Sequence, residues 1–496
     1  MAEQEGRVFK YFPNIQVDFQ DKPTGSAALR VGICGSKQAL LKEFGPNRLT
    51  EVEEGEGIGA WRDAGVKWIV ALADETAKEL EDLEELLGKL FIKVRQTTQT
   101  HLELQIFNLP ELDESRLGYY LESLNFYFCF KSQLPSKLSQ ATVLGSKHVD
   151  FEFYHSVGKA RNEARVLTGL RPCMLRIEDF YTDATQRIGE LRGGQGGLGE
   201  GKAPVEAVFI QGEELLKHNL TLLYAVGKGS AQKPALLNLK YQGNPDSSEF
   251  VGLVGKGIVY DQGGVNYKTL ALERMYNDKG GAATVYAAFW GAVSTGLKVN
   301  LTCTIALADN IVSGSCFRPS DIYKSHAGLT VEVLDTDAEG RLVLADAMSW
   351  TQDQYNLSHL IEFSTLTGAN AIALSTMGGI FTNNEACAQK FLACAKIMGD
   401  WMHIMPLLGS CFKGMKGTIS DLQNMSDTPI GGGAMKAAAF LKHFVKSTNT
   451  KWIHVDMGGV ALARVGRLIT HEGPTGFGVG TVLEFLKRET FDQSAH

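Results

Sequence analysis

A lysine and an aspartate stand at opposite ends of a short strand-like run in VGKGIVYDQGG (254–264), at Lys256 and Asp261. The paired glycines that follow allow the backbone to turn sharply, so the strand end can present its side chains to a site. Most lysines are solvated surface charges, and a lysine binds a metal ion only as the neutral amine, which requires burial and nearby cations. The spacing of Lys256, and of Lys268 beyond it, leaves both states open.

A second acidic segment, LTVEVLDTDAEGRLVLADAM (329–348), carries Asp335, Asp337 and Glu339 alternately at the end of a strand. Gly340 breaks the extended run, and RLVLADAM is typical of the start of a helix. Because side chains at i and i+2 of an extended chain share one side, Asp337 and Glu339 can reach a single hard cation. A third carboxylate can bridge to a second ion. The spacing is equally typical of an acidic loop in solvent.

The second segment also imitates the start of a calcium-binding EF-hand loop. Loop positions one, three, five and six are filled by Asp335, Asp337, Glu339 and Gly340. Position five prefers Asp or Asn, position twelve is Asp346 rather than Glu, and a strand precedes the loop. These departures disfavour calcium binding.

The glycine-rich stretch GELRGGQGGLGEGK (189–202) formally matches a dinucleotide fingerprint, since Gly194, Gly196 and Gly199 have G-x-G-x-x-G spacing. That fingerprint binds pyrophosphate only where a strand leads in and a helix leads out. Neither flank qualifies, and the composition favours a mobile surface loop.

From about residue 205 onward, apolar strands alternate with helical or mixed stretches, which indicates a sheet covered by helices on both faces. The acidic segments then belong at strand ends and in the loops that follow them. The expected strands are PVEAVFI, PALLNLKY, EFVGLVGKGIVY, VNLTCTIALAD, LTVEVL, HLIEFSTL and WIHVDMGG.

The length of 496 residues exceeds what one hydrophobic core accommodates, so at least two domains are expected. Between residues 27 and 145, strand-like runs such as AALRVGIC and KWIVALAD alternate with helical runs such as ETAKELEDLEELLGKL. HSVGKARNEARVLTGL has helical spacing and can connect the two parts. We therefore predict an α/β protein with a smaller N-terminal α/β domain at 1–154, a connecting helix at 155–172, and a larger domain at 173–496 with a mixed sheet flanked by helices.

The composition is that of an ordinary globular protein, with 44% hydrophobic and 21% charged residues. No stretch is long and apolar enough to span a bilayer, and MAEQEGRVFK has no secretory pattern, so we expect a cytoplasmic protein without a membrane partner. The formal net charge of −7 gives no general attraction for phosphate backbones, so nucleic acid is not an expected partner.

Four motifs, in their order and separations, closely resemble the leucyl aminopeptidase family, the two-metal peptidases of the M17 type. They are VGKGIVYDQGGVNYK, MYNDKGGAATVYAA, DTDAEGRLVLADA and STLTGA. The resemblance covers residues 155–496 and is weak over the first 150 residues. It implies that the larger domain is a metallopeptidase that releases N-terminal residues, Leu- or Met-like and other apolar ones, from peptides. It also implies two divalent cations per subunit, zinc or manganese with magnesium or cobalt as alternatives, and a homohexamer.

Carried over to this chain, the family pattern supplies two ion sites that share ligands. Lys256, Asp261, Asp278 and Glu339 would bind one ion, and Asp261, Asp337 and Glu339 the other. Lys268 matches the lysine that polarises the substrate carbonyl, and Arg341 the arginine that holds bicarbonate, the general base of that family. Two cations about 3.5–4 Å apart can activate a water and bind the substrate's α-amine and carbonyl oxygen.

The resemblance also implies a pocket for the first side chain of the substrate. Its lining would be Met275, Thr365, Leu366, Gly368, Gly458 and Ala461. Met275 would offer an adaptable apolar wall, and the small residues would leave room for Leu- or Met-sized groups. Each of these residues can instead belong to the ordinary core at a helix or strand end.

Three positions depart from the family pattern: Asp335 where Asn is usual, Gln262 where Ser or Thr is usual, and Lys279 where Met is common. An added carboxylate at 335 can raise metal affinity or favour manganese, and Lys279 would act oppositely. The departures leave one rival function, a catalytically weak or silent relative with a structural or interaction role. A DNA-binding regulator is a further alternative, which neither the charge nor any helix-turn-helix supports.

Overall fold

The computed structural model describes the backbone of six strands between residues 16 and 144, and the chain at 151–193, 205–426, 431–463 and 473–494. The helical run predicted at 75–90 lies outside the described residues. The chain divides into two compact units. One comprises Met1–Lys10, Glu163–Leu462 and Pro474–His496, and the other Tyr11–Asn162 and Ala463–Gly473.

The smaller unit contains a mixed six-stranded sheet. Its strands are β1 (Gln16–Gln20), β2 (Leu29–Cys34), β3 (Ile58–Asp63), β4 (Val66–Leu72), β5 (His101–Phe107) and β6 (Gln140–Leu144). They lie in the order β1-β6-β5-β2-β4-β3, and every neighbouring pair is parallel except β3 with β4. The apolar runs AALRVGIC and KWIVALAD form β2 and β4, as their pattern predicts.

The larger unit is built on an eight-stranded sheet. Its strands are β7 (Val205–Gln211), β8 (Ala235–Gln242), β9 (Phe250–Asp261), β10 (Asn300–Asn310), β13 (Leu357–Ser364), β14 (Gly378–Thr382), β15 (Met402–Ile404) and β17 (Lys451–Asp456). Shorter strands are β11 (Ile322–Lys324), β12 (Thr330–Glu332), β16 (Leu422–Gln423), β18 (Leu462–Ala463) and β19 (Gly473–Pro474). Each of the seven runs predicted as strands beyond residue 205 overlaps one of these strands.

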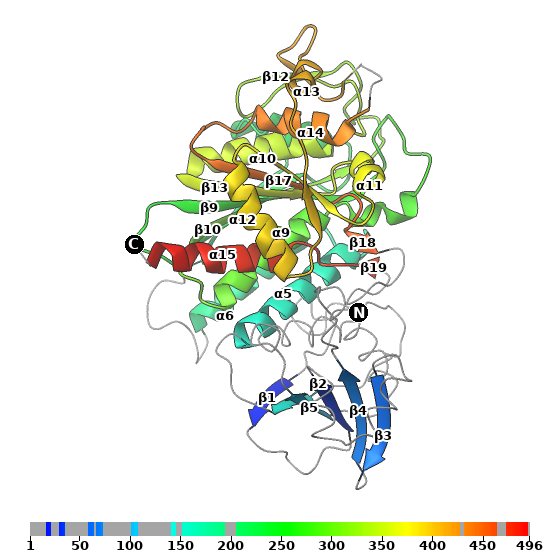
Figure 1. The fold of residues 1–496 in the computed structure, drawn as a ribbon. Helices are drawn as coiled ribbons and strands as arrows, with labels where there is room; N and C mark the ends of the chain where they lie inside the picture. The colour runs from blue at the N-terminus through cyan, green and yellow to red at the C-terminus, as the bar shows by residue number, and fades with distance from the viewer. Residues whose placement is uncertain are drawn as a thin grey trace. The chain divides into compact units, whose positions relative to one another are not determined.

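Helices cover both faces of the larger sheet, with α10 and α14 on one face and α9 and α15 on the other (Figure 1). The longer helices are α5 (Phe151–Gly169), which contains the boundary between the units, α6 (Ile177–Gly193), α9 (Gly280–Ser294), α10 (Gly340–Gln354), α12 (Glu385–Ile397), α14 (Gly433–Lys442) and α15 (Val479–Ser494). The shorter ones are α7 (Glu214–Lys217), α8 (Thr221–Gly227), α11 (Gly368–Leu374), α13 (Gly409–Lys413) and the 3-10 helix η1 (Leu272–Asn277). None of the described helices is long and apolar enough to cross a bilayer.

Four parallel strands lie side by side in the middle of this sheet, whose order is β15-β14-β17-β13-β9-β10-β8-β7. β8, β7 and β14 join by antiparallel pairing, so the sheet is mixed, as predicted. At the carboxyl ends of the parallel strands, Asp261 pairs with Asn310 and Ser364 pairs with Asp456. Because such ends meet at one edge of a sheet, the residues there can form a common site.

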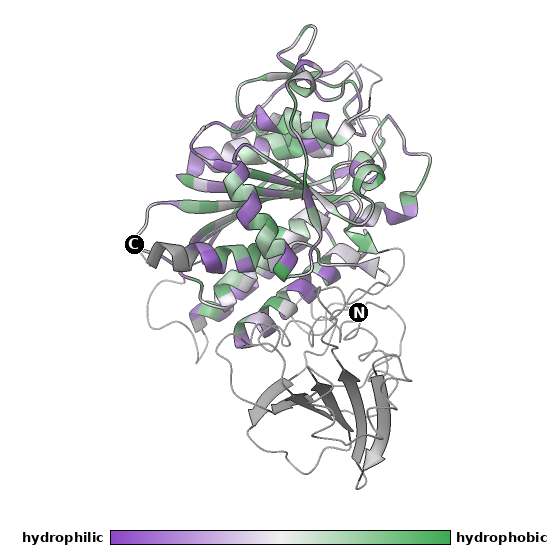
Figure 2. Cartoon of the chain, in the orientation of Figure 1, coloured by the Kyte–Doolittle hydropathy of each residue, from purple (hydrophilic) through white to green (hydrophobic). Residues whose placement is uncertain are grey.

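Helix α9 is apolar on every side, and its residues from Gly280 to Val293 are all buried. By contrast, purple and green alternate along α14 and α15 in Figure 2. Glycines let α9 approach the sheet closely, since a Cβ added at Gly255 would lie 2.7 Å from the Cα of Ala282. This contact brings the start of α9 against β9 and β13.

On the other face, α10 packs against α8 and α14. Asp346 of α10 is fully buried, and its carboxylate accepts hydrogen bonds from the backbone N–H groups of Leu222 (2.8 Å), Leu223 (3.1 Å) and His326 (2.8 Å). Two of these hydrogen bonds stabilise the first turn of α8, because the N–H groups there have no partner inside the helix.

The glycine-rich stretch begins later than predicted. Residues 189–193 belong to α6, because Glu190, Leu191 and Arg192 are good helix formers, so the prediction of a loop from 189 is wrong. Gly194, Gly196 and Gly199 lie outside the described residues. The described flanks are a helix before and a strand after, which is the reverse of the order that a dinucleotide fingerprint requires.

A buried histidine in β13 makes a prediction for acid stability. Burial, followed by the charges of Lys451 and Lys390, lowers the pKa of His359 to about 4. The ring packs edge-on against Phe485, and its Nε2 is 3.9 Å from Glu489, beyond hydrogen-bond distance. The unfolded chain therefore binds this proton at a higher pH than the folded chain does. We expect the free energy of unfolding to fall by on the order of 2 kcal/mol as the pH drops from about 6.5 to about 4.

Urea denaturation of the wild type and of His359→Phe at several pH values between these limits tests this prediction. Phenylalanine fills the same aromatic contact and cannot be protonated, so the variant should lose the part of the pH dependence that His359 causes. Identical pH dependences in the two proteins would contradict the assignment.

Candidate metal centre

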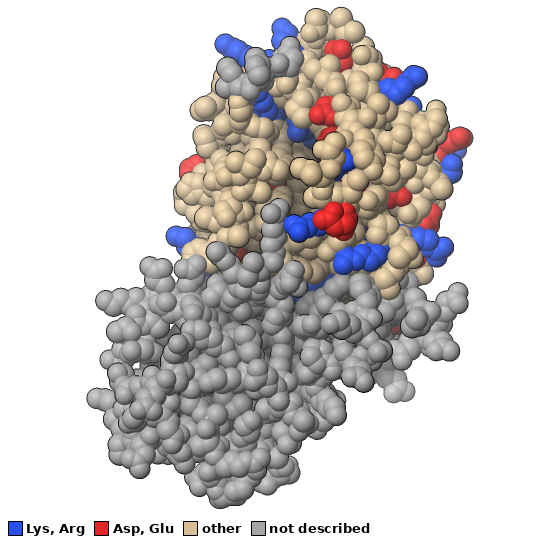
Figure 3. Space-filling model, turned by 90° about the vertical axis from the view of Figure 1, so that its right-hand side faces the viewer, with Lys and Arg blue, Asp and Glu red and all other residues tan. Residues whose placement is uncertain are grey.

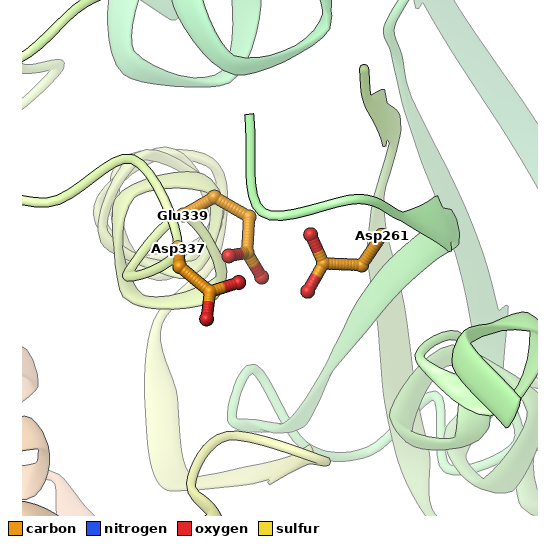
Figure 4. A group of neighbouring side chains, drawn as sticks. All are labelled: Asp261, Asp337 and Glu339. Carbon is orange, nitrogen blue, oxygen red and sulfur yellow. The ribbon is translucent and has the colours of Figure 1, made fainter. Parts of the chain in front are cut away.

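Three carboxylates converge at the carboxyl edge of the parallel strands. One oxygen atom from each of Asp261, Asp337 and Glu339 lies within 4.8 Å of the others. Figure 4 shows the three side chains pointing toward one another, Asp261 from the end of β9, Glu339 from the start of α10, and Asp337 from the loop before that helix. Asp261 and Glu339 are buried, and Asp337 is half-buried. This is a set of oxygen donors of the kind that hard divalent cations prefer.

The backbone that brings Asp337 and Glu339 together is not extended, so the predicted i, i+2 strand geometry is wrong. The Oδ1 of Asp335 accepts a hydrogen bond from the N–H of Asp337 (2.8 Å), and the N–H of Ala338 donates to the carbonyl of Asp335 (3.3 Å). Glu339 already has helical angles, φ −74° and ψ −36°. Short-range bonds from an aspartate favour a turn over a strand, and the turn leads directly into α10.

Lys256 lies within β9 yet reaches the same centre. Its Nζ is 2.8 Å from the Oδ2 of Asp278 and 2.9 Å from the Oε1 of Glu339, and it donates to the carbonyl of Thr365 (3.3 Å). β13 ends at Ser364, beside this part of β9, so the lysine faces the loop that follows. The five predicted ligands are therefore brought into one contiguous group.

Lys268 lies in the loop after β9, with its Nζ 2.8 Å from the Oδ2 of Asp261 and also in contact with the Oδ1 of Asp337. The loop turns at Gly263 and Gly264, which have φ angles of +89° and +62°. A Cβ at Gly263 would also lie 2.9 Å from the Oδ1 of Asp337, so only glycine allows both the turn and the carboxylate.

Burial and mutual repulsion dominate the electrostatics of these carboxylates. Burial, together with the charge of Glu339, raises the pKa of both Asp261 and Asp337 to about 6, and burial raises the pKa of Asp278 to about 7. Burial would also raise the pKa of Glu339, but the charges of Lys256 and Lys268 outweigh it and lower that pKa.

The lysines respond in the opposite sense. Burial alone would lower the pKa of Lys256 and of Lys268, but the neighbouring carboxylates outweigh it and raise both above the ordinary value. Four carboxylates then face two ammonium groups, which leaves an excess of negative charge in a buried site. The donor set and its charge fit divalent cations, which would replace the ammonium of Lys256 as the partner of Asp278 and Glu339.

Arg341 of α10 supplies the nearby cationic group. It is buried, its Nη1 donates to the backbone carbonyl of Asn424 (2.7 Å), and its Nε has no hydrogen-bond partner among the described residues. Burial lowers the pKa of Arg341 to about 10, so the side chain stays charged at neutral pH. A buried guanidinium with an unsatisfied donor fits a small anion.

Two asparagines that the sequence analysis missed support the centre. The Nδ2 of Asn310 donates to the Oδ1 of Asp261 (2.8 Å) and to the carbonyl of Thr336 (3.0 Å), so it orients one carboxylate. Asn310 directly follows the predicted strand VNLTCTIALAD, so its position at a strand end could have marked it as a candidate site residue. Partners of this kind fix the orientation of metal ligands.

Asn424 fastens the loop that carries Asp337. Its Oδ1 accepts from the N–H groups of Leu334 (2.8 Å) and Asp335 (3.2 Å), and its Nδ2 donates to the carbonyl of Asp335 (2.6 Å). It follows β16, which pairs with β12 just before that loop. Nothing in the local sequence marks this asparagine, because the pairing joins segments about ninety residues apart.

The predicted pocket residues fall on two loops, on η1 and on the first residue of α11. The Oγ1 of Thr365 donates to the Oδ1 of Asp278 (2.6 Å), which ties the first loop to the centre. A Cβ added at Gly280 would lie 3.4 Å from both Thr365 and Ala461, so these two residues adjoin the start of α9. Gly368 is exposed with open space where a Cβ would point.

The remaining pocket residues are placed differently. Leu366 packs partly against the hydrophobic core, and Met275 is half-buried in η1, where its carbonyl accepts from the N–H of Asp278 (3.3 Å). A Cβ at Gly458 would lie 2.3 Å from the carbonyl oxygen of Thr367, so this glycine allows two loops to touch.

Lys279 points away from the carboxylates. It is fully buried, and its Nζ donates to the backbone carbonyls of Thr168 (3.4 Å), Leu170 (2.8 Å) and Tyr276. Burial, followed by the charge of Arg171, lowers the pKa of Lys279 to about 7. The side chain thus joins the end of α5 to the residues that lead into α9.

Gly340 provides a direct test of the packing around Lys256. A Cβ at this position would lie 2.6 Å from the Cε and 2.7 Å from the Nζ of Lys256, so Gly340→Ala must displace the lysine. We expect a loss of Mn²⁺ affinity of about 10- to 100-fold, the usual effect of moving the support of a metal ligand. Calorimetric titration measures it, with Gly189→Ala in α6 as the control for a glycine that has no atom near its Cβ position. Equal affinities in the wild type and Gly340→Ala would contradict this account of Lys256.

The surface of the larger unit carries both signs of charge. On the face shown in Figure 3, Lys and Arg are interspersed with Asp and Glu, and most of the surface is neutral. This face therefore has no single basic patch of the kind that tracks a phosphate backbone.

Comparisons with known proteins identify relatives of this chain. The model of the cytosol aminopeptidase family, catalytic domain, matches residues 176–483. The probable cytosol aminopeptidase of Wolbachia pipientis wMel is 36% identical over 382 residues, which are 75% of this chain and 74% of that protein. The probable cytosol aminopeptidase of Chlamydia trachomatis serovar A is 34% identical over 294 residues, which are 59% of this chain and 58% of that protein. That second match spans less than two thirds of the relative.

Among solved structures, the bottromycin maturation enzyme BotP in complex with Mn superposes with a TM-score of 0.81 at 26% identity, and the match covers 94% of this chain and all of that one. The family match spans more than half of the chain and includes every residue of the centre. The chain therefore belongs to the cytosol aminopeptidase family.

Proposed function

We propose that this protein is a metal-dependent aminopeptidase that releases N-terminal residues, Leu- or Met-like and other apolar ones, from peptides. The observation that supports it most is the convergence of Asp261, Asp337 and Glu339 beside Lys256 and Lys268, in a chain of the cytosol aminopeptidase family. No side-chain nucleophile is needed for this chemistry.

Lys256, Asp261, Asp278, Asp337 and Glu339 would hold two divalent cations. When bound, such a pair lowers the pKa of a water and polarises the carbonyl of the scissile bond. The solved structure of BotP in complex with Mn supports manganese, with zinc, cobalt or magnesium as alternatives. The carboxylates, whose pKa values are raised by burial, would release protons as they bind metal, so affinity should increase with pH.

The remaining residues act on the substrate. Lys268, charged and half-buried, would donate to the oxygen that becomes negative as the carbonyl is attacked. Arg341 would hold bicarbonate as the general base, and its unsatisfied Nε supports an anion there. The pocket for the first side chain of the substrate would be formed by Met275, Thr365, Leu366, Gly368, Gly458 and Ala461. We further propose a cytoplasmic homohexamer, as in the family that the sequence resembles.

Release of aminomethylcoumarin from aminoacyl substrates tests this function. The protein is dialysed against chelator, and Mn²⁺, Zn²⁺, Co²⁺ or Mg²⁺ is then added back. We expect no activity after chelation and recovery with at least one metal. A protein that stays inert with every metal, on Leu, Met and Ala substrates alike, would favour a catalytically silent relative instead.

A further inference from the structure

The two loops that carry the proposed pocket follow neighbouring parallel strands. Thr365, Leu366 and Gly368 come after β13, and Gly458 and Ala461 come after β17. Asp456 is the last residue of β17 and lies opposite Ser364, the last residue of β13. It is fully buried and takes no part in the chemistry proposed above.

The Asp456 side chain holds both loops at once. Its Oδ1 accepts hydrogen bonds from the N–H groups of Leu366 (3.3 Å) and Thr367 (3.3 Å) in the first loop and of Gly458 (3.1 Å) in the second. Its Oδ2 accepts from the hydroxyl of Thr367 (2.6 Å). In addition, the Nδ2 of Asn370 in α11 donates to the backbone carbonyl of Asp456 (3.0 Å).

The loops are in direct contact where Asp456 joins them. A Cβ at Gly458 would lie 2.3 Å from the carbonyl oxygen of Thr367, so the spacing between the loops is set by backbone atoms. Thr367 also begins α11, because its Oγ1 accepts from the N–H of Asn370 (3.1 Å). A change at Asp456 therefore moves the first loop, the second loop and the start of α11 relative to one another.

A buried histidine accompanies this carboxylate. His454 lies two residues earlier on the same side of β17, and its Nδ1 is hydrogen-bonded to Glu362 of β13; both side chains are fully buried. Burial raises the pKa of Asp456 overall, although the charge of His454 and the hydrogen bond from Thr367 act in the opposite direction. For His454, burial lowers the pKa, but Glu362 outweighs it and raises the pKa overall.

We propose that Asp456 is a positioning residue that fixes the spacing between the two pocket loops and so determines which N-terminal side chains the enzyme accepts. This inference rests on the proposed aminopeptidase function. It assigns side-chain selection to a residue that touches neither the metal centre nor the substrate, and acts through Leu366, Thr367 and Gly458.

The experiment compares Asp456→Asn and Asp456→Ala with Asp346→Asn. Asp346 is a matched control, since it is equally buried and accepts three backbone N–H groups, but it fastens α8 far along the chain from the pocket loops. For each protein we would measure KM and kcat on Ala, Leu and Phe aminoacyl-coumarins, Mn²⁺ affinity by calorimetry, and hydrogen exchange in peptides covering 365–370 and 457–461.

We expect the Asp456 variants to raise KM for Leu by about 10- to 100-fold, as loss of a supporting hydrogen-bond network does. The ratio of kcat/KM between the three substrates should change, exchange in both peptides should accelerate, and Mn²⁺ affinity should stay the same. Asp346→Asn should lower the melting temperature without changing the ratio. Asp456→Asn keeps the volume of the side chain and covers the case in which Asp456→Ala does not fold.

Unchanged substrate ratios and exchange in an active Asp456 variant would overturn the proposal. A fall in Mn²⁺ affinity parallel to the loss of activity would overturn it too, because Asp456 would then support the metal centre instead. If the wild type hydrolyses none of the substrates, the proposed function fails, and the exchange measurement still decides whether Asp456 holds the two loops.

Discussion

Glu339→Ala should abolish metal binding and lower kcat/KM by at least about 1000-fold, which corresponds to roughly 4 kcal/mol of transition-state stabilisation. Glu339 stands at the middle of the carboxylate group, close to Asp261 and Asp337, and its Oε1 is 2.9 Å from Lys256. Removing it deprives both proposed ions of a ligand and leaves Lys256 with one carboxylate partner fewer. Mn²⁺ titration calorimetry and coumarin release measure the two effects on the same preparation.

Two further variants separate charge from position in this test. Glu339→Gln keeps the volume of the side chain and should also lose metal affinity, since a neutral amide is a weaker ligand than a carboxylate. Glu332→Ala removes a glutamate from β12 in the same segment and should bind Mn²⁺ as the wild type does. If Glu339→Ala still bound two Mn²⁺ ions with wild-type affinity, the proposed centre would be wrong.

Lys268→Met should reduce kcat by about 100- to 1000-fold, the effect of removing one donor to a developing oxyanion. The neighbouring carboxylates keep this lysine charged, and it lies in a loop at the edge of the centre with its Nζ 2.8 Å from Asp261. Because the lysine competes with metal for Asp261 and Asp337, its removal should leave Mn²⁺ affinity unchanged or higher. That combination distinguishes it from a ligand such as Glu339.

Lys268→Arg provides the matched control, since it keeps the charge and should recover part of kcat. Steady-state kinetics at saturating Mn²⁺ gives kcat and KM, and calorimetry gives metal affinity. If Lys268→Met lost metal binding as well as kcat, the lysine would be holding the loop or the ligands rather than acting on the substrate.

The strands of the larger unit could be predicted because a strand that is buried on both faces has a nearly continuous run of apolar residues. EFVGLVGKGIVY and VNLTCTIALAD are examples. Asp261 lies at the carboxyl end of one of these strands, as predicted. The local conformation at Asp337 and Glu339 could not be predicted, because it depends on the side-chain bond from Asp335 and on the clamp from Asn424, which is about ninety residues away in sequence.

The state of Lys256 illustrates the same limit. Its type and spacing match a surface lysine as well as a buried one, and only the end of β13 at Ser364 together with Gly340 explains why it reaches Asp278 and Glu339. Asp456, by contrast, could have been identified from the sequence. It follows an apolar strand and shortly precedes two glycines, as Asp261 does, so the same pattern marks both residues.

The position of β17 in the sheet has a consequence for biosynthesis. β17 lies between β13 and β14, yet it is made after both of them. Until residues 451–456 leave the ribosome, the facing edges of β13 and β14 lack their hydrogen-bonding partner and can pair with another chain. Asp456 arrives on that same strand, so the nascent protein is prone to aggregation for as long as its pocket loops are unassembled. Chaperone protection should therefore matter most between the emergence of β14 and the emergence of β17 from the ribosome.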